Sequence, residues 1–257
     1  MRLILVPAAI AASAVAAPAL AQSVELRVTA TNLAPTNSVT FAPLRVGFGN
    51  GSFDSFDINE IAGPAITSVA EGGSGSDWFP AFEAAEPNAT LGTVVSDPAG
   101  PLLPGASASA VFTIDTDTNQ FFTFASMVVP SNDHFIGNDS PTQYRLFDDA
   151  GNLLINSIGQ TADQIWDNGS EATDPANAAF LVGGVNANRT PQGGVVTFDF
   201  DGLNAFNGLE TAAGYTFDSQ LTSGLDVYSI TFEVIPAPAT AGMLGLAGLA
   251  ATRRRRA

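Results

Sequence analysis

The sequence contains no cysteine, no lysine and a single histidine. Without cysteine neither a disulfide framework nor a thiolate metal site can form, so stability has to come from core burial and from any bound metal. His134 is the only residue that could act as the base of a Ser-His-Asp triad, and no Gly-x-Ser-x-Gly elbow accompanies it. We interpret His134 as a hydrogen-bonded loop residue. Phosphate-binding and Rossmann glycine patterns are also missing, so the sequence carries no positive signal for an enzyme.

Charged residues are scarce as well, at 13% of the 257 residues, whereas hydrophobic residues make up 46% and are accompanied by 25 Gly and 16 Pro. This composition favours one β domain of short strands joined by loops over long salt-bridged helices. All 25 acidic residues lie between the two terminal segments, where only four arginines accompany them. Such an acidic body should repel nucleic acid and anionic membrane surfaces and attract divalent cations or basic partners. Acidity that only keeps the protein soluble explains the bulk charge equally well.

The N-terminal residues 1–21 have the layout of a secretory signal peptide. Arg2 provides a positive start, residues 3–17 are apolar, and Ala19-Leu20-Ala21 is a small-x-small cleavage site. We therefore expect export from a bacterial cell and a mature chain that begins at Gln22.

The C-terminal residues 236–257 combine a Pro-Ala-Pro start, a short apolar run and the cluster Arg253–Arg256. The apolar run is too short to span a hydrocarbon core of ~30 Å. The layout resembles the PEP-CTERM sorting tail of Gram-negative bacteria, although Ala237 stands where glutamate is usual. The resemblance implies a transient contact with the inner membrane and an exosortase-type protease as partner.

Between the termini, short runs of alternating apolar and polar residues predict strands. The clearest are 24–30, 107–114, 121–129, 195–200 and 228–234. Strands at this spacing, with connections rich in glycine and proline, predict an all-β fold, an antiparallel β-sandwich of residues 22–235.

The connections between these runs also predict local structure. The turns at 115–119 and 149–152 should each close a β-hairpin. A short helix or an irregular crossing is expected within 56–69, followed by a loop at 71–76, and short surface helices around 160–166 and 177–180.

Two acidic loops stand out. In the first, a strand ends at Pro130 and a Ser-Asn-Asp sequence brings Asp133 into a loop. In the second, Asp167 and Glu171 flank Gly169, whose tolerance of positive φ would let the loop curl and the two carboxylates converge. Converging carboxylates repel unless a cation lies between them, and oxygen ligands from loops suit Ca²⁺. Spacing alone leaves a solvated acidic turn equally open.

Both loops lie within five strings that together resemble the spondin domain, in the same order along the chain. These strings are residues 28–35, 41–44, 100–105, 125–137 and 167–171. His134 departs from the family pattern, in which Trp or Gly is common at that place. The resemblance implies a β-sandwich akin to C2 domains, with Ca²⁺ bound at one end by Asp133, Asp167 and Glu171.

The resemblance and the terminal segments together favour a secreted, calcium-dependent binding or adhesion module of the cell surface or extracellular matrix, with a glycan or a surface protein as its ligand. Two alternatives stay open. A secreted hydrolase that acts on polysaccharide would use an Asp/Glu pair facing a groove. A purely structural component of an exopolysaccharide matrix would carry its metal only incidentally.

Overall fold

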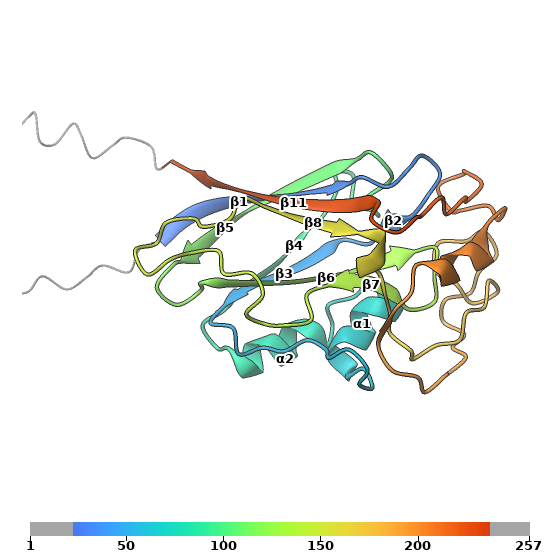
Figure 1. Cartoon of the computed structure of the whole chain (residues 1–257), viewed down its shortest axis with the longest axis horizontal. Coiled ribbons are helices and arrows are strands. Elements are labelled where there is room, and N and C mark those ends of the chain that lie inside the picture. The colour runs from blue at the N-terminus through green and yellow to red at the C-terminus, as the bar shows by residue number, and fades with distance from the viewer. Residues whose placement is uncertain (1–22, 237–257) are drawn as a thin grey trace, which may run out of the picture.

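The computed structural model describes residues 23–236, which contain two antiparallel β-sheets and two short α-helices joined by long connections (Figure 1). The expected signal peptide, residues 1–21, lies outside the described residues, and so does the expected sorting tail apart from Pro236. Within residues 23–236 no helix has both the length and the apolar character needed to cross a bilayer. The predicted all-β antiparallel sandwich is confirmed.

The four-stranded sheet contains the longest strands and has the order β5-β1-β11-β8. Their bounds are β1 (Ser23–Asn32), β5 (Ser107–Asp115), β8 (Ser157–Thr161) and β11 (Asp226–Ile235). Along β11 the side chains of Tyr228, Ile230 and Phe232 are buried, whereas Thr231 and Glu233 are exposed. One face of this sheet therefore covers the core and the other faces solvent, as the alternating pattern predicts.

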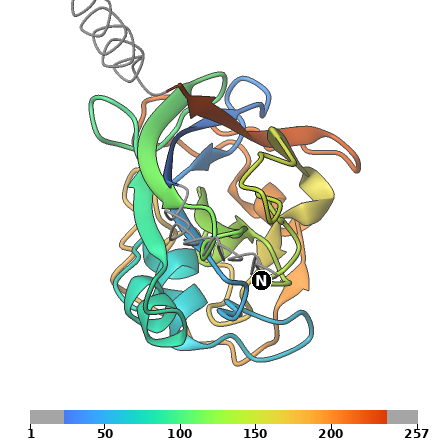
Figure 2. The same cartoon turned by 90° about the vertical axis from the view of Figure 1, so that its left-hand side faces the viewer.

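The second sheet has the order β10-β9-β7-β6-β3-β4, with β2 paired to β6. Its strands are β2 (Thr40–Phe41), β3 (Leu44–Gly49), β4 (Thr90–Val94), β6 (Phe121–Val129), β7 (His134–Gly137), β9 (Trp166–Asp167) and β10 (Thr197–Phe198). After its first residue β6 is buried along its whole length. It is covered on both faces, by the four-stranded sheet on one side and by the helices on the other (Figure 2).

The helices α1 (Pro64–Gly72) and α2 (Trp78–Ala85) form a third layer on the outer face of this sheet (Figure 1). Pro64 begins α1, where a missing N–H costs nothing, and Gly73 ends it in the left-handed region at φ 58°. Helix α2 lies very close to β3, because a Cβ added at Gly47 would come within 2.3 Å of the Phe82 ring. Glycine at position 47 is therefore what allows the helix to approach the sheet.

Two hydrophobic clusters correspond to these layers. The larger one fills the space between the two sheets. The smaller one lies under the helices and is rich in aromatic side chains, namely Phe53, Phe56, Trp78, Phe82, Phe135 and Trp166. Several of their rings meet edge to face, such as Phe56 with Phe135 at 4.9 Å between centroids. This second cluster connects α1 and α2 to the strands that carry the site described below.

Most predicted strands are confirmed, but two expectations about connections are wrong. Residues 115–119 do not close a hairpin, because β5 pairs with β1 whereas β6 pairs with β3 and β7 in the other sheet. The turn instead carries the chain from one sheet to the other. The expected loop at 71–76 is also helical at its start, since α1 extends to Gly72.

The structure confirms some other expectations about connections, wholly or in part. Around 149–152 a small hairpin forms, with a bridge between Phe147 and Leu153. The run 195–200 contributes only the two residues of β10. Short 3₁₀-helices occur at η1 (Ala162–Gln164), where one was predicted, and at η2 (Asp201–Phe206), where none was. Helix α2 was not predicted either, and the short helix expected around 177–180 is wrong, because these residues form turns and a bridge from Ala179 to Ser131.

Candidate functional site

The two acidic loops meet at the end of the sandwich where the long yellow-to-orange connections gather (Figure 1). The Asp133 side chain is buried between them. Its Oδ2 accepts hydrogen bonds from the N–H groups of Ser170 and Glu171, both at 2.9 Å, and from the Ser170 hydroxyl at 3.2 Å. Asp133 thus joins the loop after β6 to the loop after β9.

A second acidic side chain lies near Asp133. Burial, and then the carboxylate of Asp167, raise the pKa of Asp133 to about 6, while hydrogen bonding to the Glu171 N–H acts in the opposite direction. The Asp167 Oδ1 accepts a hydrogen bond of 2.6 Å from the Gly169 N–H. Gly169 has a φ of 68°, and an added Cβ there would meet the Val195 carbonyl oxygen at 2.6 Å. The curl expected at this glycine is present, and it brings the Asp167 charge close to Asp133.

Glu171 has a different environment, although it belongs to the same loop. Its side chain is 1% exposed, and its Oε1 accepts a hydrogen bond from Asn132 Nδ2 at 3.0 Å. Its Oε2 forms an ion pair with the guanidinium of Arg189, also at 3.0 Å. A divalent cation at Glu171 would have to lie beside this positive charge, so Glu171 does not fit the role of a Ca²⁺ ligand in this arrangement. Calcium binding by Asp133, Asp167 and Glu171 together stays a prediction.

The expectation that His134 is a loop residue is wrong, and the hydrogen bond at this residue is formed by its backbone N–H, to the Ser131 hydroxyl at 3.2 Å, and not by its side chain. His134 is the first residue of β7, and it is 1% exposed. Among the described residues neither Nδ1 nor Nε2 has a hydrogen-bond partner. A buried polar group left without a partner costs about 1–3 kcal/mol, so such a group calls for an explanation.

His134 belongs to a group of three side chains that could hold a metal ion, together with Asp167 and Asp199. One potential ligand atom from each of the three lies within 4.8 Å of the other two. The Nε2 of His134 is 3.7 Å from the Oδ2 of Asp199, which is too long for a hydrogen bond. The neighbouring imidazole nevertheless lowers the pKa of Asp199 against the opposing effect of burial, and the Gly202 N–H adds to the lowering.

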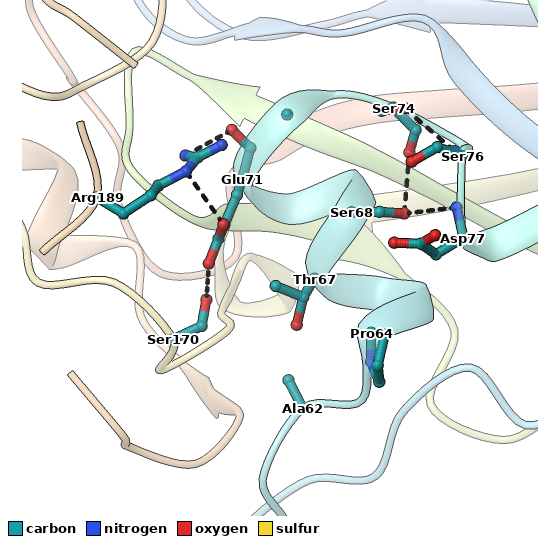
Figure 3. Close-up of a pocket in the computed structure, with 11 residues that line it drawn as sticks. Ala62, Pro64, Thr67, Ser68, Glu71, Ser74, Ser76, Asp77, Ser170 and Arg189 are labelled. Atoms are coloured by element: carbon teal, nitrogen blue, oxygen red, sulfur yellow. Dashed lines mark hydrogen bonds and ion pairs between the residues drawn. The ribbon is translucent and has the colours of Figure 1, made fainter. Parts of the chain in front are cut away.

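A pocket of about 620 Å³ opens beside the second loop, between α1 and Arg189 (Figure 3). Five of its lining residues carry hydroxyl groups, namely Thr67, Ser68, Ser74, Ser76 and Ser170. On one wall Glu71 accepts a hydrogen bond from the Ser170 hydroxyl at 2.8 Å and pairs with the Arg189 Nε at 3.3 Å. Asp77 adds a second carboxylate on the far side. The pocket therefore gathers hydroxyl and charged groups in one place, and the hydroxyls of Ser68 and Ser170 already donate to the Ala65 carbonyl and to Glu71.

Three residues of this region were not predicted from the sequence: Glu71, Arg189 and Asp199. Arg189 is one of only four arginines between the terminal segments, and an isolated cation in an acidic body is a weak signal for a buried ion pair. Asp199 gives no such signal, because it lies within an ordinary alternating run. Only strand pairing brings it to His134.

Comparison with known proteins does not assign this chain to a family. No protein-family model matches it, and no curated protein matches it.

Proposed function

We propose that the chain is an exported, spondin-like binding module that takes a polar, hydroxyl-rich ligand, such as a glycan, in the pocket between α1 and Arg189. The observation that carries this proposal is the lining of the pocket, in which five hydroxyl side chains accompany a Glu71–Arg189 ion pair. Hydroxyl groups both donate and accept hydrogen bonds, so they match the hydroxyls of a sugar. A volume of about 620 Å³ is also typical of small-molecule sites.

The hydrogen bonds around Ser170 support a pocket that is formed before the ligand arrives. The backbone N–H of Ser170 is held by Asp133, and its hydroxyl by Glu71. A wall held in this way loses little conformational freedom when a ligand binds, which favours affinity. Calcium is not part of this proposal, because Arg189 already engages Glu171.

The hydrolase alternative receives less support from the same wall. A glycosidase needs two carboxylates that act on a bond between them. In this pocket the Glu71 carboxylate is taken up by Arg189 and Ser170. The arrangement suits the recognition of a ligand better than the transfer of a proton.

The cellular setting belongs to the proposal as well. The signal-peptide layout of residues 1–21 supports export, and the layout of residues 236–257 supports sorting by an exosortase-type protease after transient contact with the inner membrane. We place the protein on the cell surface or in the extracellular matrix. The acidic body supports a neutral or basic ligand over nucleic acid.

A glycan array probed with the full chain tests the pocket, followed by calorimetric titration of any glycan that binds. Gly72 lines the pocket, and a Cβ added there meets only the Ser74 Cβ at 3.7 Å, so Gly72→Leu should fill the pocket without disturbing the helix. We expect this variant to bind at least about tenfold more weakly, which corresponds to 1.4 kcal/mol.

Gly63→Leu is the matched control, because Gly63 precedes the same helix, does not line the pocket and has nothing within 4 Å of an added Cβ. It should bind like the unchanged chain. An array on which nothing binds, or equal binding by both variants, would refute the proposal.

A further inference from the structure

We infer that His134, Asp167 and Asp199 bind one transition-metal dication of the Zn²⁺ type. This site is separate from the pocket that carries the proposed glycan binding, and the inference does not depend on that proposal. It also differs from the calcium site that the family resemblance implies, since only Asp167 is common to both sets of residues.

The three side chains come together because three short strands are neighbours at the edge of the seven-stranded sheet. His134 in β7 lies opposite Asp167 in β9, and Asp167 lies opposite Thr197 in β10. Asp199 follows Thr197 by two residues, and its N–H donates to the Ile165 carbonyl at 3.0 Å, which continues the same edge. Residues opposite one another in adjacent strands project on the same face, so this register directs all three side chains toward one point.

His134 supplies an independent sign that a ligand belongs at this point. Its imidazole is buried, and neither ring nitrogen has a hydrogen-bond partner within residues 23–236. One of these nitrogens is within 4.8 Å of both aspartate oxygens of the group. A metal ion bound to one nitrogen would provide a closer partner than the Asp199 carboxylate, whose Oδ2 is 3.7 Å from Nε2.

The spacing is close to what a bound metal requires. With metal–ligand bonds of about 2.0–2.2 Å, two ligand atoms of a tetrahedral site are ~3.4 Å apart. The Nε2 of His134 and the Oδ2 of Asp199 are 3.7 Å apart, so a small movement of side chains closes the site. Backbone N–H groups orient both carboxylates, with Gly169 donating to Asp167 Oδ1 and Gly202 donating to Asp199 Oδ1.

The ligand set indicates which kind of metal fits. Two carboxylates balance the charge of a dication, and an imidazole nitrogen favours Zn²⁺ and its neighbours in the first transition row over Ca²⁺, which takes oxygen ligands. A hollow of about 300 Å³ is lined in part by Phe198, Asp199 and Asp201, so it borders one of the three proposed ligands. Three protein ligands leave a coordination position for water.

The presence of only one histidine makes a direct test possible. In the metal-stripped full chain labelled with ¹⁵N-histidine, the imidazole signals belong to His134 alone. We expect one equivalent of Zn²⁺ to shift the signal of the ligating nitrogen, and an equal concentration of Ca²⁺ to leave it in place. Imidazole signals that do not respond to Zn²⁺ would overturn the inference.

Variants identify the other two ligands through the visible absorption of bound Co²⁺, a common substitute for Zn²⁺. Asp199→Asn and Asp167→Asn should each weaken Co²⁺ binding at least about tenfold. Asp201→Asn makes the same change of charge at an exposed residue beside the same hollow and should bind Co²⁺ as the unchanged chain does.

Glu171→Gln separates the inferred site from the calcium site that the resemblance implies, and it should leave Co²⁺ affinity unchanged. Equal weakening by Asp199→Asn and Asp201→Asn would show that general acidity holds the metal and would overturn the site. Preference for Ca²⁺ over Co²⁺, lost in Glu171→Gln, would overturn it in favour of the calcium site.

Discussion

Arg189 is the residue that connects the two acidic parts of the loop end. Its guanidinium contacts Glu171, whose side chain is 1% exposed, and also contacts Glu71 at the wall of the pocket. The buried Glu171 carboxylate thus has two partners, the guanidinium of Arg189 and the side-chain amide of Asn132. Removing a single partner from such a pair costs far more than the pair itself contributes, because the remaining charge stays buried.

Arg189→Met should therefore destabilise the protein by about 1–3 kcal/mol. This is less than the cost of breaking a fully buried ion pair, because Arg189 itself is partly exposed. The double variant Arg189→Met/Glu171→Gln should recover part of the loss, since it no longer buries a charge. Urea unfolding of the single and double variants measures both quantities.

The pair between Arg27 and Glu233 provides the matched control, because its side chains are 43% and 65% exposed. Arg27→Met should change the free energy of unfolding by less than about 1 kcal/mol. If Arg189→Met cost no more than Arg27→Met, the buried ion pair would not have the structural role that we assign to it.

At the scale of elements, β10 is the strand on which the proposed metal site most depends. It has two residues, it lies at the edge of its sheet, and Phe198 within it is 50% exposed. The Phe198 ring stacks on Trp166 of β9 at 3.8 Å between centroids. Because two backbone residues provide few ladder hydrogen bonds, we attribute much of the attachment of β10 to this aromatic contact.

Phe198→Ala should accordingly release β10 while the rest of the sandwich stays folded. We expect faster hydrogen exchange at the Asp199 amide, which bonds to the Ile165 carbonyl, and unchanged exchange along β11. The global free energy of unfolding should fall by only about 1 kcal/mol.

Val111→Ala, in the edge strand β5, serves as a control because Val111 is similarly exposed, at 49%. It should leave exchange at Asp199 unaltered. Slow exchange at Asp199 in Phe198→Ala would mean that backbone pairing alone holds β10 in place.

At the scale of the whole molecule, an acidic body lies between two terminal segments whose only charged residues are arginines, and the proposed cellular route depends on those segments. Protein recovered from outside the cytoplasm should begin at Gln22, as mass spectrometry of the intact chain would show. Ala21→Phe places a large side chain at the cleavage site and should leave the precursor uncut. A full-length chain that accumulates in the cytoplasm would contradict export.

Local patterns in the sequence determined the class of fold and most of the long strands. Alternation along 24–30, 107–114 and 228–234 was sufficient, because one face of each of these strands packs on the core and the other faces solvent. The same rule says nothing about which strands pair. It therefore missed that the turn at 115–119 crosses between sheets, and it could not foresee α2, whose burial depends on Gly47 of β3.

The candidate site shows the same division between what local sequence patterns predict and what tertiary contacts decide. Sequence spacing identified the two acidic loops, and the structure brings them together through Asp133. It did not identify Arg189 as the partner of Glu171, nor Asp199 as the neighbour of His134. Those contacts join segments that are distant along the chain, and strand register and loop packing decide them. The types of residue available for chemistry were thus set by the sequence, and their partners were decided only when the tertiary structure placed β7, β9 and β10 side by side.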